Sequence, residues 1–117
     1  AMSLDVEVEK ENHSLGEVII LKLIGDMKQE YLPPLENIIQ EIFDAQEARL
    51  ILDLENVYSI TSSGLGLLIN FIQHPNASLG IRLIHVQSKF KVLFDLLGMG
   101  DRLKIFPDKE AALVDWQ

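Results

Sequence analysis

The sequence predicts a single α/β domain with a mixed, mostly parallel sheet of four to five strands, an N-terminal antiparallel hairpin and about four helices. The chain has 117 residues, enough for one domain with a core and too few for two ordinary ones. Hydrophobic residues make up 48% of it, which excludes the disordered class. After the hairpin, predicted strands and helices alternate, and this order is typical of a parallel sheet with right-handed crossovers.

The first two strands are predicted to pair as the hairpin. Residues 6–9 alternate apolar and acidic side chains, the pattern of a strand with one solvated face. After the turn-like residues 12–16 comes an apolar run over residues 18–24, which we expect Gly25 to end. Residues 1–3 resemble a remnant of an expression vector, so the domain is assigned to residues 4–117.

The next three elements are a helix, a buried strand and a second helix. The first helix is predicted to begin at Pro33 and Pro34, where a missing N–H costs little, and to end near Ala48. Its apolar stripe consists of Leu35, Ile38, Ile39, Ile42 and Phe43. The short apolar run over residues 50–54 predicts a strand covered on both faces. Residues 62–73 are predicted to form the second helix, which Pro75 stops.

The remaining elements continue the alternation. Residues 81–86 predict another buried strand, and Ser88 is expected to cap the helix that follows. The apolar stripe of this helix and the glycine just beyond its end are Phe90, Leu93, Phe94, Leu97 and Gly98. A short strand over residues 103–106 follows, and Asp108 is expected to cap a last helix that reaches about Trp116.

Composition excludes several classes of function. The formal net charge is −8, and ten basic residues are scattered among eighteen acidic ones, so neither nucleic acid nor an anionic membrane surface is an expected partner. The absence of cysteine excludes disulfides and thiol chemistry. The apolar stretches are interrupted well before the roughly 20 residues that a membrane span needs, and no secretory signal is visible. We therefore expect no membrane insertion and a cytoplasmic location.

Three hydroxyl side chains stand between two of the most apolar segments, at Thr61, Ser62 and Ser63. A helix cap formed by Thr61 or Ser62 explains one hydroxyl, not three followed by Gly64 and Gly66. A helix N-terminus offers free N–H donors and partial positive charge, so it tolerates a phosphate group. The residues alone therefore leave two interpretations open, a simple helix cap and a phosphorylation site.

No catalytic or metal motif is recognised. The third glycine of a dinucleotide loop would fall at Ile69, and the P-loop lysine is missing. A nucleophile elbow around Ser62 would need glycine where Ile60 stands. The histidines are far apart in the sequence, without evident orienting partners: His13, His74 and His85. We predict no enzyme activity, no cofactor and no metal.

The central segment resembles the signature of STAS domains, the family of bacterial anti-sigma factor antagonists. The matching residues are Leu52, Asp53, Leu54, Val57, Ile60 and Ser62-Ser63-Gly64-Leu65-Gly66. Three further segments resemble family motifs in the same order: residues 23–27, 90–99 and 106–113. The resemblance covers nearly the whole chain and implies a STAS-like fold.

The resemblance also implies a switch. In that family the first serine of the motif, here Ser62, is phosphorylated by a serine kinase that doubles as an anti-sigma factor. The unphosphorylated protein binds the kinase and frees a sigma factor, and a serine phosphatase resets it. The implied partner surface comprises Asp26, Met27, Thr61, Ser62, Ser63, Gly64 and Leu65. Thr61 and Ser63 are secondary candidates for phosphorylation, and we expect a monomer or a weak dimer.

Two residues depart from the family pattern. Thr61 replaces the usual aspartate before the acceptor, and Lys28 stands where many kinase-regulated members have an acid. These changes leave open a different partner, phosphorylation at Thr61, or an unmodified stress-signalling scaffold. Two other functions stay open as well. One is a STAS subunit of a membrane transporter complex without phosphate control, and the other is a sensor that binds a nucleotide near Ser62.

Overall fold

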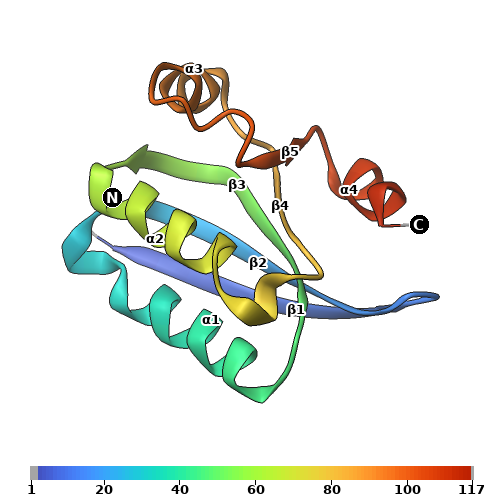
Figure 1. The fold of residues 1–117 in the computed structure, drawn as a ribbon. Coiled ribbons are helices and arrows are strands. Elements are labelled where there is room, and N and C mark those ends of the chain that lie inside the picture. Colours follow the sequence, from blue (N-terminus) through green and yellow to red (C-terminus); the bar gives the residue numbers. More distant parts are fainter. Residues whose placement is uncertain (1–2, 117) are drawn as a thin grey trace.

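The computed structural model describes residues 3–116, so Leu4 lies within the described part and residue 117, the other limit of the predicted domain, lies outside it. It contains one five-stranded sheet in the order β1-β2-β3-β4-β5 (Figure 1). β1 and β2 pair antiparallel and the other neighbours pair parallel, which confirms the predicted fold class. The strands are β1 (Leu4–His13), β2 (Gly16–Met27), β3 (Arg49–Ile60), β4 (Ile81–Ile84) and β5 (Lys104–Phe106).

Four α-helices connect or follow these strands: α1 (Pro33–Ala45), α2 (Ser62–Ile72), α3 (Ser88–Leu96) and α4 (Lys109–Asp115). Short 3-10 turns precede α1 and follow α2, at Gln29–Tyr31 and Pro75–Ala77. None of the helices within residues 3–116 has the length and apolar character that spanning a bilayer requires.

The sheet separates two hydrophobic clusters of unequal size. Along β3, Leu50 and Leu52 belong to the larger cluster and Ile51 to the smaller one, because successive side chains of a strand point to opposite faces. Buried residues of α1, α2 and α3 join the larger cluster, whereas α4 contributes Ala112 to the smaller. Figure 1 shows α1 and α2 running side by side along the strands, well away from α4. The face of the sheet under α4 is therefore the less covered one.

The central strands are longer than the sequence predicts. Gly25 does not end β2 but lies within it at φ +125°, and a Cβ there would overlap the backbone of Ser3. β2 continues to pair as far as Met27 with Ile60, across two irregularities in register. The second half of β3 is polar and forms a strand through this pairing. The apolar run over residues 50–54 therefore predicts only the first half of β3.

Two predicted helix ends are also wrong. α1 ends at Ala45, because Gln46 adopts extended backbone and Ala48 leads into β3. Ser88 is the first residue of α3, and its N-cap is Gln87, whose side chain donates to the carbonyl of Val57 at 2.7 Å. Because this side chain donates to β3, it does not accept from the N–H groups of α3, and α3 has no side-chain cap.

Two further predicted helix ends, the start of α4 and the end of α3, are confirmed. Asp108 caps α4 by accepting a hydrogen bond from the N–H of Ala111 at 2.9 Å. Gly98, just beyond the end of α3, has φ +70°, which glycine adopts without strain.

Candidate functional site

The candidate site forms where β3 ends at Ile60 and α2 begins at Ser62. Between them Thr61 is the N-cap, with extended backbone at φ −85° and ψ 172°. Its Oγ1 accepts from the N–H of Gly64 at 3.4 Å and donates to the carbonyl of Met27 at 3.0 Å. The backbone N–H of Thr61 donates to the same carbonyl at 3.1 Å. Thr61 therefore joins the start of α2 to the end of β2.

The three hydroxyls of this site differ in environment. Thr61 is half-buried and uses its oxygen in the two bonds just described. Ser62, the first helical residue, is exposed. Ser63 is half-buried and lines a hollow of about 590 Å³ between the start of α1 and α2. Of the three, Ser62 is the most accessible to a modifying enzyme.

Gly64 allows α2 to approach β2 closely. A Cβ at this position would lie 2.8 Å from the carbonyl oxygen of Met27, too close for any other residue without a shift of backbone. Gly66 is exposed and has open space around it. The first glycine of the motif is thus required by packing, whereas the second is not.

Asp26 and Met27, predicted to belong to the partner surface, are buried in the free domain, with 5% and 0% of their area exposed. The hydroxyl of Ser59 donates to Asp26 Oδ1 at 2.7 Å. This hydrogen bond holds the pKa of Asp26 below its usual value of 3.8, because it stabilises the ionised form. A partner that docks on the free domain would therefore not contact these two side chains directly. Their segment affects the surface by fixing the position of Thr61.

The start of α2 is electrostatically suited to an anion. Unpaired N–H groups and the helix dipole place partial positive charge there. The first turn of α2 carries no acidic residue. Residues 61–65 therefore offer an exposed hydroxyl at a helix end whose field favours added negative charge.

Comparison with known proteins identifies the family. The model of the STAS domain family matches residues 8–112. The chain belongs to the STAS domain family. This confirms the resemblance carried by the central motif, and no curated protein matches the sequence.

Anti-sigma factor antagonists are among the solved structures with a similar fold. One from Mycobacterium paratuberculosis is 20% identical, with a TM-score of 0.78 over 95% of this chain and 93% of that one. SpoIIAA in its unphosphorylated form is 17% identical, with a TM-score of 0.67 over 95% and 96%. The phosphorylated form of Bacillus SpoIIAA is 19% identical, with a TM-score of 0.66 over 95% and 97%. At these identities the similarity establishes a shared STAS fold.

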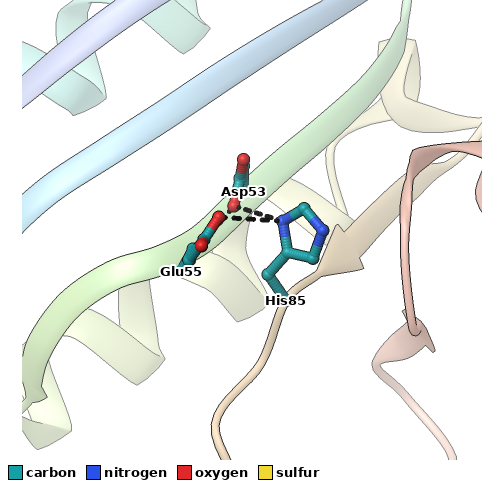
Figure 2. Close-up of side chains that lie close together, drawn as sticks. All are labelled: Asp53, Glu55 and His85. Atoms are coloured by element: carbon teal, nitrogen blue, oxygen red, sulfur yellow. Dashed lines mark hydrogen bonds and ion pairs between the residues drawn. The ribbon is translucent and has the colours of Figure 1, made fainter.

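A second group of polar side chains, absent from the sequence prediction, lies away from this site. Figure 2 shows Asp53 and Glu55 on β3 facing His85, which directly follows β4. The prediction that the histidines lack orienting partners is wrong, because His85 Nδ1 lies 3.0 Å from Asp53 Oδ1. The other two histidines also have partners: His13 Nε2 lies 3.0 Å from Glu11 Oε1, and His74 Nδ1 accepts from the N–H of Asn76 at 3.0 Å. The signal in the sequence is the spacing of Asp53 and Glu55, since residues i and i+2 of a strand share a face.

Proposed function

We propose that this STAS domain is a regulatory binding module of the anti-sigma factor antagonist kind. In its unmodified form it binds an anti-sigma factor that has serine kinase activity. Phosphorylation of Ser62 by that kinase releases it, and a serine phosphatase restores the binding form. The domain itself has no catalytic activity and works in the cytoplasm.

The observation that carries this proposal is the contact between two motif segments distant in the sequence. The carbonyl of Met27 accepts bonds from both the N–H and the hydroxyl of Thr61, so residues 26–27 and 61–65 form one structural unit. Within that unit Ser62 is the exposed hydroxyl. A kinase that docks on this unit would find the acceptor at its centre.

The departure from the family pattern at Thr61 is compatible with this role. Threonine and aspartate are both effective N-caps, so the change preserves the start of α2. The hydroxyl also donates to the carbonyl of Met27, which a carboxylate cannot do. What the replacement removes is a negative charge beside the acceptor, which bears on the choice of kinase more than on the fold.

The experiment is phosphorylation of the purified domain with ATP and Mg²⁺. The kinases to use are histidine-kinase-like serine kinases encoded near its gene. We expect one phosphate, located on Ser62 by peptide mass spectrometry and lost in Ser62→Ala. Ser63→Ala is the matched control, because it removes the adjacent hydroxyl and leaves the proposed acceptor in place. Modification confined to Thr61 or Ser63 would contradict the assignment of Ser62.

Binding completes the test. The unmodified domain should bind the kinase, and the phosphorylated domain should bind it far more weakly. Equal affinity of the two forms would exclude the switch. It would favour a scaffold or transporter subunit without phosphate control, and transporter genes beside this gene would point the same way. Hydrolysis of ATP or esters by the domain alone, lost in Ser62→Ala, would contradict the assignment as a non-enzyme.

A further inference from the structure

The strongest unexplained feature is the group formed by Asp53, Glu55 and His85. Each side chain contributes one potential ligand atom, and these atoms lie within 4.8 Å of one another. His85 Nδ1 is 3.0 Å from Asp53 Oδ1 and 3.7 Å from Glu55 Oε2 (Figure 2). Ligands bound tetrahedrally to zinc, with bonds of about 2.0–2.1 Å, lie about 3.3 Å apart. The two histidine–carboxylate separations are close to this value, and the whole group needs only a small adjustment of the exposed Glu55 side chain to surround one ion.

The backbone brings these side chains together. Asp53 and Glu55 share the less covered face of the sheet, because they are two residues apart on β3. Leu83 and Val86 both belong to the larger core although two residues stand between them, so the alternation of faces is interrupted just after β4, at His85. His85 has φ +55° and is the one residue other than glycine with a positive φ in the described part of the chain. This conformation places its imidazole on the same face as the two carboxylates.

The group is also held in orientation. Asp53 Oδ1 accepts a hydrogen bond from the backbone N–H of Glu55 at 3.0 Å, which fixes the carboxylate. The side chain of Asp53 is 13% exposed, that of His85 is 35% exposed and that of Glu55 is 60% exposed. The group is therefore anchored at Asp53 and open to solvent at Glu55, which gives an ion a path of entry.

The surroundings are acidic. Asp53 and His85 line a hollow of about 290 Å³ between the sheet and the start of α4. Its wall includes the further acidic residues Glu9, Asp108 and Glu110. The lysine in that wall, Lys109, is 2.8 Å from Glu11 and so is already paired. This excess of negative charge attracts a cation.

We propose that Asp53, Glu55 and His85 bind one divalent transition-metal ion, with zinc as the best match. One imidazole and two carboxylates are ligands that zinc accepts, and Mg²⁺ and Ca²⁺ favour oxygen ligands alone. Three protein ligands leave a fourth position for water. The ion joins β3 to the segment after β4. The stretch from Glu55 to Ile60 spans about 17 Å of extended chain, so the metal site is separate from Ser62 and does not depend on the function proposed above.

The test is calorimetric titration of the tag-free protein with Zn²⁺ in a buffer that does not chelate metal. We expect one ion per chain and a higher melting temperature with Zn²⁺. His85→Gly and Asp53→Asn should each weaken binding at least tenfold. Glycine adopts positive φ without strain, so His85→Gly removes the ligand while the fold is kept. Circular dichroism checks that both variants are folded.

His13 supplies the matched control. Its Nε2 lies 3.0 Å from Glu11 Oε1, so it forms a histidine–carboxylate pair of the same length without belonging to the proposed group. His13→Gln should bind Zn²⁺ as tightly as the unchanged protein. The proposal is overturned if no binding is detected at millimolar Zn²⁺, if His85→Gly binds as well as the unchanged protein, or if His13→Gln lowers affinity as much as His85→Gly does.

Discussion

Thr61 and Ser62 carry the same functional group but lie in different environments. The hydroxyl of Thr61 is part of the fold, because it accepts from Gly64 and donates to Met27. The hydroxyl of Ser62 is exposed. A modification of Thr61 would disrupt two hydrogen bonds, whereas a modification of Ser62 adds to the surface. This difference between neighbours makes Ser62 the reasonable position for a reversible switch.

Substitution separates the two roles. Thr61→Val keeps the shape but removes the cap, so we expect the free energy of unfolding to fall by about 0.5–2 kcal/mol. Ser62→Ala changes an exposed side chain and should stay within about 0.5 kcal/mol of the unchanged protein. Urea denaturation of both variants measures this. Equal losses would mean that the cap is not formed by Thr61.

Asp26 gives a prediction for pH. Its pKa in the folded domain is lowered from 3.8, first of all by the hydrogen bond from Ser59. A lowered pKa means that the unfolded chain takes up the proton at higher pH than the folded one. The stabilisation is therefore complete above the unfolded pKa and is lost as the pH falls through the folded pKa.

The comparison is with Asp26→Asn, which has a similar shape and does not titrate. The stability difference between the two proteins should be constant from pH 7 to 5 and should shrink below about pH 4. Urea denaturation at each pH gives this difference and cancels the contribution of the other carboxylates. A difference that stays constant down to pH 3 would show that the ionised form of Asp26 is not favoured by folding.

At the scale of elements, α2 is a core helix that also carries Ser62, the proposed acceptor of the phosphate. Its buried residues are Gly64, Leu65, Leu67, Leu68 and Phe71. Only Ser62, Gly66 and Asn70 of this helix are exposed, so it is buried on most sides. Because its apolar body is fixed against the sheet, its first turn has a defined position on the surface. A docking partner would therefore meet a surface that is already in place before binding.

The two glycines of α2 are predicted to respond in opposite directions. Gly64→Ala places a Cβ 2.8 Å from the carbonyl oxygen of Met27 and should destabilise the domain by about 1–3 kcal/mol. Gly66→Ala meets nothing within 4 Å and should stabilise it by roughly 0.5–1 kcal/mol, because alanine favours helix. Thermal denaturation distinguishes them. Similar effects of both variants would mean that α2 does not approach β2 as described.

Leu68 tests the packing of the same helix. It is 2% exposed, so Leu68→Ala leaves a cavity and should lower the free energy of unfolding by about 2–5 kcal/mol. Asn70→Ala, on the exposed face of α2, is the control and should change stability by no more than about 0.5 kcal/mol. An unchanged denaturation midpoint for Leu68→Ala would place this helix outside the core.

At the scale of the whole molecule, the domain has a well-covered side and an open one. Three helices cover the larger hydrophobic cluster, whereas α4 alone among the helices contributes to the smaller cluster. The proposed switch lies at the start of a helix on the covered side, and the proposed metal group lies on the open side. The two can be tested independently because each can be changed without the other.

Phosphorylation should act at an interface and not by refolding the domain. A phosphate adds roughly −1.5 to −2 charge, and the helix dipole stabilises a favourable charge by only about 0.3–1 kcal/mol. This is small beside the packing of a five-stranded sheet and its helices. Ser62→Asp and the phosphorylated protein should therefore keep near-native circular dichroism spectra and melting temperatures. A domain that unfolds on modification would contradict this mechanism.

The sequence by itself determines the order of strands and helices, the apolar stripes and the position of the hydroxyls. These features depend on local periodicity and on capping residues, which neighbours in the chain reveal. A hydroxyl cap at Thr61 or Ser62 and the helix that follows it are predicted from such signals, and the structure assigns the cap to Thr61. The central family motif is contiguous in the sequence, so it is recognised from neighbouring residues in the same way.

Only the tertiary structure decides which distant residues meet. The second half of β3 becomes strand because β2 pairs with it beyond Gly25. Asp26 becomes buried because β3 brings Ser59 beside it. His85 meets Asp53 because β4 pairs with β3 and His85 takes a backbone conformation that few residues other than glycine adopt. The physical reason is the same each time, since these contacts arise from pairing across the sheet and leave no periodic trace along the chain.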